Sequence, residues 1–276
     1  MAKNWLSPQE LHASLADPSL RIFDVRFDLK RPEWGRAAYL EGHLPGAQFL
    51  DLDRDLSGPR SRHGGRHPLP DWGLFAERLR QLGLGAMDRV VAYDSSGGMF
   101  AARLWWMLRH LGHARVQLLD GGFPRWQELG LPVTAEISPP ARGDFTPRAF
   151  APDLVEIDQL EALLREGAQL IDARSPDRYR GENETIDPVA GHIPSALNFP
   201  HTDNLSGARL KQPSELGELY RPLRGKQLVV YCGSGVSAAM DVLALDEIGI
   251  AAKLYAGSWS DYVSYPDRPV ARGEQP

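Results

Sequence analysis

The sequence is poor in cysteine, because Cys232 is the only one among 276 residues. A single cysteine excludes an internal disulfide and a cysteine-rich metal site, and we expect no metal or other cofactor. It also fits a reducing compartment. Long hydrophobic runs are missing too, since no apolar stretch approaches the roughly 20 residues that a membrane-spanning helix needs. The N-terminal segment lacks the apolar core of a signal peptide, so we expect a cytoplasmic protein with no membrane partner.

An excess of positive charge is absent as well. The chain carries 31 Lys and Arg residues against 36 Asp and Glu residues, for a net charge of −5 at pH 7. We therefore expect no general attraction to nucleic acid or to an anionic membrane. Hydrophobic residues make up 42% and charged residues 24% of the chain, which is the balance of a folded globular protein. The length suffices for one large domain or two of ordinary size.

The sequence contains four landmarks that each occur twice, in the same order. The run that ends at Asp24 returns at Asp172, residues 42–47 (GHLPGA) return as 191–196 (GHIPSA), residues 90–94 return as 228–232, and residues 119–126 return as 255–262. The spacing is a domain length of roughly 140 residues, which indicates a duplicated domain and not a solenoid. We expect domains at residues 1–133 and 154–276, joined by a proline-rich linker at 134–153.

Within each half, short apolar strands alternate with helical patterns. The predicted strands are 90–93, 115–119, 228–231 and 252–255, and the predicted helical runs are 100–111 and 236–248. This alternation predicts an α/β fold with a parallel sheet and helices on both faces. In such sheets ligands bind beyond the carboxyl ends of the strands. Asp94 and Cys232 both occupy that place.

Cys232 stands where a predicted strand ends and a predicted helix begins. Gly233 and Gly235 allow a tight turn, which aims backbone N–H groups at the open end of the helix. The partial positive charge of about half a unit there lowers the pKa of a thiol from its ordinary value of about 8.5. The sequence therefore predicts an activated nucleophile, stabilised by the amides from Gly233 to Ala238. The alternative is a buried, inert cysteine.

Several reactions use a cysteine in this position. A protein tyrosine phosphatase needs an arginine six residues after the cysteine to bind phosphate, and Ala238 stands there. A cysteine protease needs a histidine as base, for which His43, His192 and His201 are available. A sulfur carrier needs only a stabilised thiolate that takes up sulfur as a persulfide. Because Asp94 replaces the cysteine in the first half, we expect only the second half to be catalytic.

Together these motifs resemble a known family, the two-domain rhodanese-type sulfurtransferases. The resemblance extends from about Trp5 to Val270 and rests on the duplication, on Gly-His-x-Pro-x-Ala in both halves and on Cys-Gly-Ser-Gly-Val-Ser-Ala at 232–238. It implies two tandem rhodanese-like domains, each a mostly parallel sheet flanked by helices, with a degenerate first domain. It also implies a persulfide on Cys232, whose sulfur passes to cyanide or to a thiol such as glutathione or a thioredoxin-like protein.

The residues after the cysteine differ between two branches of this family. Thiosulfate sulfurtransferases typically carry basic residues there, whereas 3-mercaptopyruvate sulfurtransferases typically carry Gly-Ser-Gly-Val-Thr. This chain has the neutral loop Gly233, Ser234, Gly235, Val236 and Ser237, which resembles the second branch. We therefore expect a small anionic sulfur donor, 3-mercaptopyruvate or thiosulfate. A thiosulfate-preferring enzyme and a non-enzymatic persulfide carrier or binding module are the alternatives.

The resemblance also implies a proton relay beside the cysteine. In the mercaptopyruvate branch a serine at the position of Ser234 works with a histidine, for which we predict His43. The acidic third member has no clear match, and Glu33 is the nearest candidate in the sequence. Because Gly-His-x-Pro occurs in both halves, the alternative for His43 is a structural role that braces its loop.

Donor binding is expected to depend on arginine. Arg178 matches the family residue that holds the anion of the donor, and its fixed fork of donors suits a carboxylate or sulfonate. A second arginine, expected nine residues later, is replaced by Asp187. The irregular basic stretch 53–70 offers Arg62 and Arg66 as compensating cations at the cleft between the halves. A solvated surface loop is the alternative for this stretch.

Overall fold

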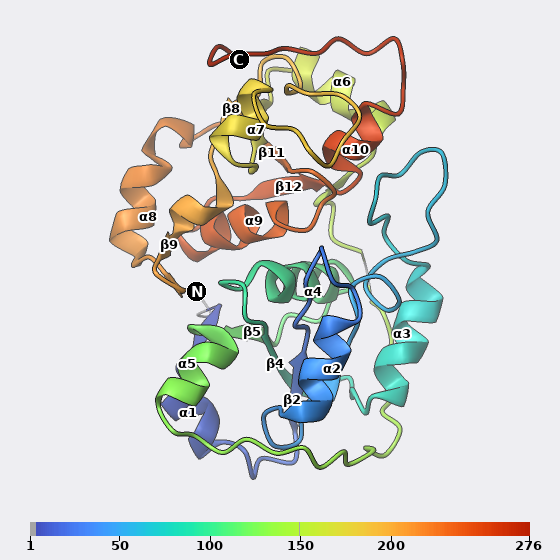
Figure 1. Ribbon diagram of the computed structural model, residues 1–276, viewed down its shortest axis with the longest axis vertical. Helices are drawn as coiled ribbons and strands as arrows, with labels where there is room; N and C mark the ends of the chain where they lie inside the picture. Colours follow the sequence, from blue (N-terminus) through green and yellow to red (C-terminus); the bar gives the residue numbers. More distant parts are fainter. Residues whose placement is uncertain (1–3, 149) are drawn as a thin grey trace.

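The computed structural model describes residues 4–148 and 150–276, so residues 1–3 and 149 of the predicted domain and linker lie outside the described residues. The chain folds into two α/β units that stack along the long axis of the molecule (Figure 1). We call residues 4–128 the first unit and residues 154–265 the second unit. The exact limits of the predicted domains stay a prediction.

The first unit alternates strands and helices. Its elements are β1 (Trp5–Leu6), α1 (Pro8–Ala13), β2 (Leu20–Asp24), α2 (Trp34–Glu41), β3 (Gln48–Phe49), α3 (Trp72–Gln81), β4 (Arg89–Tyr93), α4 (Met99–His110), β5 (Val116–Leu119) and α5 (Gly122–Glu128). The strands at 90–93 and 115–119 and the helix at 100–111 are confirmed to within one residue at each end.

The second unit repeats this order and adds a small hairpin. Its elements are β6 (Leu154–Val155), α6 (Ile157–Arg165), β7 (Gln169–Asp172), α7 (Pro176–Arg180), β8 (Leu197–Asn198), η1 (His201–Asn204), β9 (Leu205–Ser206), β10 (Arg209–Leu210), α8 (Pro213–Leu219), η2 (Arg221–Leu223), β11 (Leu228–Tyr231), α9 (Ala238–Glu247), β12 (Ala252–Tyr255) and α10 (Ser258–Tyr262). Helix α9 begins two residues later than predicted, because the turn at Gly235 extends to Ser237.

Each unit is built on a parallel sheet of five strands in the described residues. The strand orders, β1-β5-β4-β2-β3 and β6-β12-β11-β7-β8, match one another position by position. This correspondence confirms the predicted duplication and the α/β fold. Asp94 and Cys232 directly follow the middle strands, β4 and β11, so both residues lie at the carboxyl edge of their sheets, where ligands of parallel sheets bind.

Helices α4 and α9 pack against each other where the two units meet (Figure 1). A helix buried on all sides is apolar all round, and nearly every residue of α4 and the first eight residues of α9 are buried. Each helix is covered by its own sheet on one side and by the other unit on the opposite side. One core cluster accordingly contains Trp105 and Met107 of α4 with Met240 and Leu243 of α9. The turns after both middle strands also meet the opposite unit, since Gly97 lies against Leu205 and Gly233 lies near Arg66.

The segment predicted as a linker, 134–153, runs along the first unit as extended chain. Thr134 forms a bridge with His43, and Phe145 is buried in the core. Backbone hydrogen bonds from Gly143 to Arg80 and from Ala151 to His110 attach the segment further. The semi-extended conformation agrees with the prediction, and the described residues of the segment make these contacts with the first unit, while its last residue, Asp153, accepts from the Leu254 N–H of the second unit. Among the described residues, no helix combines the length and apolar character that crossing a membrane requires.

Candidate active site

The nucleophile candidate Cys232 lies at the end of β11, just before the turn that leads into α9. Its side chain is 2% exposed. Gly235 makes the turn possible, because its φ of +74° is unfavourable for other residues and a side chain there would collide with the Ala256 carbonyl. The Trp259 N–H donates to the Cys232 carbonyl at 2.9 Å. The start of α10 thus fixes the back of the turn.

The sulfur of Cys232 is surrounded by hydrogen-bond donors. It accepts from the Ser237 hydroxyl and from the backbone N–H groups of Ser234, Ala238 and Gly235. Burial by itself raises the pKa of the Cys232 thiol, but these four donors lower it, and the resulting pKa lies below the ordinary value. Donors that favour the charged form outweigh desolvation here. The turn therefore favours the thiolate form of Cys232, and its donors fall within the predicted stretch from Gly233 to Ala238.

Ser234, two residues after the cysteine, is hydrogen-bonded to a histidine of the first unit. The Ser234 hydroxyl lies 2.8 Å from Nδ1 of His67, and Nε2 of His67 lies 3.4 Å from Oδ1 of Asp53. Burial, followed by the charges of nearby arginines, lowers the pKa of His67 to about 3, so the ring is neutral at neutral pH. Because Nε2 faces a carboxylate, we assign its proton there, which leaves Nδ1 to accept from Ser234.

The prediction that Ser234 pairs with His43 is therefore wrong. Both ring nitrogens of His43 face backbone carbonyls, those of Tyr39 at 2.8 Å and Glu136 at 3.2 Å. The ring also stacks on Tyr39 with centroids 4.0 Å apart. His192 has the same type of environment in the second unit. The repeated Gly-His-x-Pro motif thus braces a loop in each unit, as its presence in both halves suggested.

Glu33 is not part of the relay either. It is exposed and pairs with Arg54 at 2.6 Å. The residues that sequence reasoning missed, His67 and Asp53, both lie in the basic stretch 53–70. The sequence offered one signal for His67, namely the predicted place of this basic stretch at the cleft between the halves. A histidine in a segment that reaches the nucleophile is a stronger relay candidate than a histidine in a duplicated motif.

Two arginines approach the backbone beside the nucleophile. A side chain built on Gly233 would come within 2.9 Å of Nη2 of Arg66 and 3.4 Å of Nη1 of Arg178. Glu184 holds Arg178 in place by accepting from Nε and Nη2, each at 3.0 Å. Asp187 lies between the two guanidinium groups and pairs with both. The arginines thus keep one terminal nitrogen each directed at Gly233, next to Cys232.

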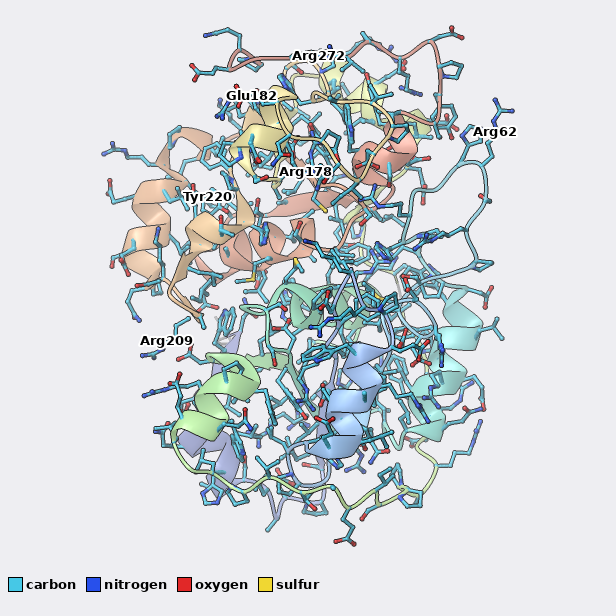
Figure 2. All side chains as sticks on the ribbon, in the orientation of Figure 1. Arg62, Arg178, Glu182, Arg209, Tyr220 and Arg272 are labelled. Carbon is cyan, nitrogen blue, oxygen red and sulfur yellow. The ribbon has the colours of Figure 1, made fainter. Side chains whose placement is uncertain are left out.

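Arg62, the other predicted cation, does not lie with this pair. Its side chain is exposed, and Figure 2 shows it on the outer loop of the first unit, directed away from the molecule and far from Arg178. The prediction that Arg62 binds substrate is therefore wrong. The chain folds back between Arg62 and Arg66, where the Ser61 hydroxyl donates to the His63 carbonyl, and only the later residues of the stretch face the second unit.

The basic stretch 53–70 docks on α10 of the second unit. His63 stacks on Tyr265 with ring centroids 4.1 Å apart. The Gly64 N–H donates to Asp261 at 2.7 Å, and the Arg66 N–H donates to the Ser260 hydroxyl at 3.0 Å. These contacts deliver the relay histidine and one arginine to a cysteine that belongs to the other unit. The predicted alternative of a freely solvated loop therefore fails for residues 63–67.

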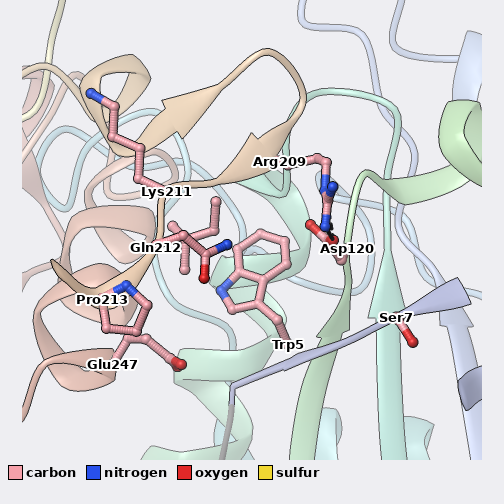
Figure 3. Close-up of a pocket in the computed structure, with 9 residues that line it drawn as sticks. Trp5, Ser7, Asp120, Arg209, Lys211, Gln212, Pro213 and Glu247 are labelled. Carbon is pink, nitrogen blue, oxygen red and sulfur yellow. Dashed lines mark hydrogen bonds and ion pairs between the residues drawn. The ribbon is translucent and has the colours of Figure 1, made fainter. Parts of the chain in front are cut away.

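A separate hollow of about 310 Å³ lies between β1 and the β9–β10 hairpin (Figure 3). Trp5, Lys211 and Gln212 line it, and Arg209 pairs with Asp120 at its side at 2.6 Å. It contains no residue of the turn after Cys232 and lacks the chemistry of the cysteine site. In the described part of the chain, no group of three or more His, Cys, Asp or Glu side chains is placed to hold a metal ion.

Comparison with known proteins places this geometry in a family. Residues 7–129 and 156–265 each match the rhodanese-like domain. A Pseudomonas aeruginosa protein named as a probable 3-mercaptopyruvate sulfurtransferase is 46% identical over 278 residues, which cover 98% of each chain. A Mycobacterium tuberculosis protein named provisionally as a thiosulfate sulfurtransferase is 42% identical over 271 residues, which cover 93% of this chain and 92% of that protein.

Solved structures agree with this relationship. The crystal structure of the Escherichia coli 3-mercaptopyruvate sulfurtransferase SseA superposes with a TM-score of 0.83 at 34% identity, covering 94% of this chain and all of that one. The matched residues include both units and the cysteine turn, so the resemblance found in the motifs is confirmed. The chain belongs to the rhodanese-like domain family, as a sulfurtransferase-type member with two of these domains.

Proposed function

We propose that this protein transfers a sulfur atom from 3-mercaptopyruvate, through a persulfide on Cys232, to cyanide or to a thiol acceptor such as glutathione or a thioredoxin-like protein. The observation that carries the choice of donor is the hydrogen bond between Ser234 and His67 beside the Cys232 sulfur. We further propose that the protein works in the cytoplasm, because a carrier with one free thiolate needs a reducing compartment.

The first half of the reaction moves sulfur onto the enzyme. The Cys232 thiolate attacks the sulfur of the donor thiol, and an S–S bond forms while the bond between that sulfur and C3 of the donor breaks. The electron pair of the broken bond leaves on C3 as the enolate of pyruvate. The thiol proton of the donor passes to this carbon, giving pyruvate and an anionic persulfide. The donors around Cys232 stabilise the terminal sulfur as they stabilised the thiolate.

The proton transfer distinguishes the two candidate donors. 3-Mercaptopyruvate carries a thiol proton, and the carbon anion left after sulfur transfer must be protonated. Thiosulfate carries no such proton, and its leaving group is sulfite. Neutral His67 accepts from the Ser234 hydroxyl, so the pair can pass a proton along beside the reacting sulfur, and the low pKa of His67 favours rapid return of that proton. The Ser234–His67 pair can therefore assist transfer from 3-mercaptopyruvate, whereas transfer from thiosulfate requires no such proton movement.

The arginine pair supports the same donor. The free terminal nitrogens of Arg66 and Arg178 suit the carboxylate of the donor, while Asp187 and Glu184 cancel the charge of the two guanidinium groups. A site of low net charge disfavours a dianion such as thiosulfate more than a singly charged carboxylate. Asp187 therefore stands where a second arginine was expected but does not remove the anion site, because Arg66 reaches it from the first unit.

The second half of the reaction restores the enzyme. Cyanide or an acceptor thiolate attacks the terminal sulfur of the persulfide, a bond forms between the acceptor and that sulfur, and the S–S bond breaks. The electron pair returns to Cys232 as the thiolate, and the product is thiocyanate or an acceptor persulfide.

Steady-state rates with each donor, with cyanide as acceptor, test the proposal. We expect kcat/KM for 3-mercaptopyruvate to exceed that for thiosulfate by at least about tenfold, a difference of about 1.4 kcal/mol in transition-state binding. The mass of the intact protein after incubation with 3-mercaptopyruvate alone should increase by one sulfur atom, and the Cys232→Ser variant should gain none.

A higher kcat/KM with thiosulfate would contradict the choice of donor while leaving the persulfide in place. A wild-type protein that gains no sulfur from either donor would overturn sulfur transfer itself. A persulfide that forms but turns over slowly with both cyanide and glutathione would point to a carrier that serves a specific protein acceptor.

A further inference from the structure

A fully buried arginine of the first unit reaches the turn that follows the nucleophile. Arg103 lies in α4 and is 0% exposed. Its Nη1 donates to the Gly235 carbonyl at 3.0 Å, and its Nη2 donates to the His67 carbonyl at 2.9 Å and the Leu56 carbonyl at 3.0 Å. The guanidinium therefore joins α4, the basic stretch 53–70 and the turn after Cys232 at one point.

The charge of Arg103 has no carboxylate partner among the described residues. Its acceptors are three neutral carbonyls, and its Nε has no hydrogen-bond partner in the described part of the chain. Burial lowers the pKa of Arg103 to about 10, which still leaves the group charged at neutral pH. A buried charge without an opposite charge is unfavourable. The anion that acts on Arg103 is the Cys232 sulfur, which raises the arginine's pKa.

Two of the three carbonyls belong to residues with a role beside the sulfur. Gly235 donates its N–H to the Cys232 sulfur and offers its carbonyl to Arg103. His67 binds Ser234 through its ring and offers its carbonyl to the same guanidinium. A shift of Arg103 would thus move both a donor to the sulfur and the ring that accepts the serine proton.

The other titratable groups near the Cys232 sulfur differ from Arg103 in exposure, charge or pairing. Arg66 and Arg178, which approach the turn at Gly233, are partly exposed and paired with carboxylates. Asp241, on α9, is fully buried, and burial raises its pKa well above the ordinary value. His67 is neutral at neutral pH. Arg103 is the buried cation among these groups whose charge no carboxylate cancels.

We propose that Arg103 is a positioning residue for sulfur transfer. Its charge favours an anionic sulfur on Cys232, both as thiolate and as persulfide, and its bonds to the Gly235 and His67 carbonyls hold the cysteine turn and the relay histidine in register across the boundary between the units. The assignment of the persulfide rests on the proposed function, whereas the effect on the thiolate does not.

The rate of Cys232 alkylation by iodoacetamide as a function of pH tests the charge. Because Cys232 is the only cysteine, the reaction reports on this thiol alone. We expect the midpoint of the profile to rise by about one pH unit in Arg103→Met, with the rate at neutral pH falling about tenfold as the thiolate fraction falls. Arg109→Met is the matched control, since Arg109 lies on the same helix and pairs with Asp246 at 3.1 Å. Its midpoint should equal that of the wild type.

Arg103→Lys separates charge from position and guards against poor folding of the methionine variant. Lysine keeps the charge but cannot span three carbonyls with a fixed fork. The alkylation midpoint should therefore stay within a few tenths of a unit of the wild type. kcat with 3-mercaptopyruvate should fall at least about tenfold, because Ser234 and His67 lose their fixed relation.

A wild-type alkylation midpoint in Arg103→Met, accompanied only by a lower melting temperature, would reduce Arg103 to a structural residue and overturn the proposal. An unchanged kcat in a folded Arg103→Lys would overturn its positioning role. If the wild-type protein gains no sulfur from either donor, the proposed function fails, yet the alkylation profiles still decide whether Arg103 stabilises the thiolate.

Discussion

Each unit places a ring of backbone N–H groups at the end of its middle strand, and the two rings enclose different side chains. In the second unit the ring surrounds the Cys232 sulfur. In the first unit it surrounds the carboxylate of Asp94, whose Oδ1 accepts from Ser96 and Gly98 at 2.7 and 2.9 Å and whose Oδ2 accepts from Phe100 and Ala101 at 2.8 and 3.0 Å. Both turns thus donate to a buried acceptor, but only the sulfur is a nucleophile.

The surroundings of the two rings differ as much as their centres. Around Cys232 stand a serine–histidine pair, two arginines and the buried guanidinium of Arg103, and part of this set comes from the first unit. The first unit was expected to be a structural partner that forms the cleft. The structure shows that it also delivers His67, Asp53 and Arg66 to the cysteine, so a unit without a nucleophile still carries half of the candidate site.

The largest effect is expected from making the two rings alike. Cys232→Asp should abolish sulfur uptake from either donor, because a carboxylate cannot form a persulfide. The melting temperature should stay close to that of the wild type, since the new carboxylate can take the N–H groups as Asp94 does. Intact mass after incubation with donor and a thermal melt check both parts. Loss of folded protein would show that the two rings are not interchangeable.

A smaller loss of activity is expected when the relay histidine is replaced. His67→Gln should lower kcat with 3-mercaptopyruvate by about 10²- to 10⁴-fold, and the loss with thiosulfate should be much smaller, because that donor carries no thiol proton. His43→Gln serves as the comparison, since His43 bonds only to carbonyls. It should lower stability without changing the ratio of the two donors. Equal losses for both donors in His67→Gln would contradict a proton-transfer role.

Donor preference should respond to the charge between the arginines. Asp187→Asn leaves Arg66 and Arg178 in place but removes the carboxylate that pairs with both. We expect kcat/KM for thiosulfate to rise relative to that for 3-mercaptopyruvate by about three- to tenfold, or roughly 1 kcal/mol. Glu182→Gln is a matched control from the same loop, since Glu182 pairs outward with Arg180 at 2.7 Å. An unchanged ratio would show that Asp187 does not select the donor.

The mildest change is expected when the first ring loses its charge. Asp94→Asn cannot accept at both side-chain positions, which leaves buried N–H groups such as that of Phe100 unpaired. Each such loss costs about 1–3 kcal/mol, so the free energy of unfolding in urea should fall by that order. kcat should stay at the wild-type value. A fall in kcat without a fall in stability would assign the first ring a direct part in transfer.

The fold was predictable because its signals are local and duplicated. The strand ending at Tyr231 is a short apolar run, and the turn after Cys232 needs glycine at a fixed place, so both are legible in the chain. The relay was not, because the contact of Ser234 with His67 spans 167 residues and depends on how the basic stretch docks. The Gly-His-x-Pro motif led to the prediction that His43 acts in the relay, although the occurrence of this motif in both halves indicates a structural role.

Arg103 illustrates the same limit in another form. In the sequence it is one charged residue inside an apolar helix, and its acceptors are backbone carbonyls that carry no residue-type signal. Arg62 shows the reverse case, since its charge made it a candidate while its place on the loop removed it. Side-chain type predicts what a group can do, and only the packing of the two units determines where it does so.

The carboxylate inside the first ring also bears on how a duplicated gene can diverge. A copy whose nucleophile is replaced by a side chain that accepts no hydrogen bond leaves a set of inward-facing donors unsatisfied and loses stability for that reason. A short acid such as Asp94 keeps those donors occupied, so a unit without a nucleophile keeps the stability of its turn and can still supply residues to the site of the other unit.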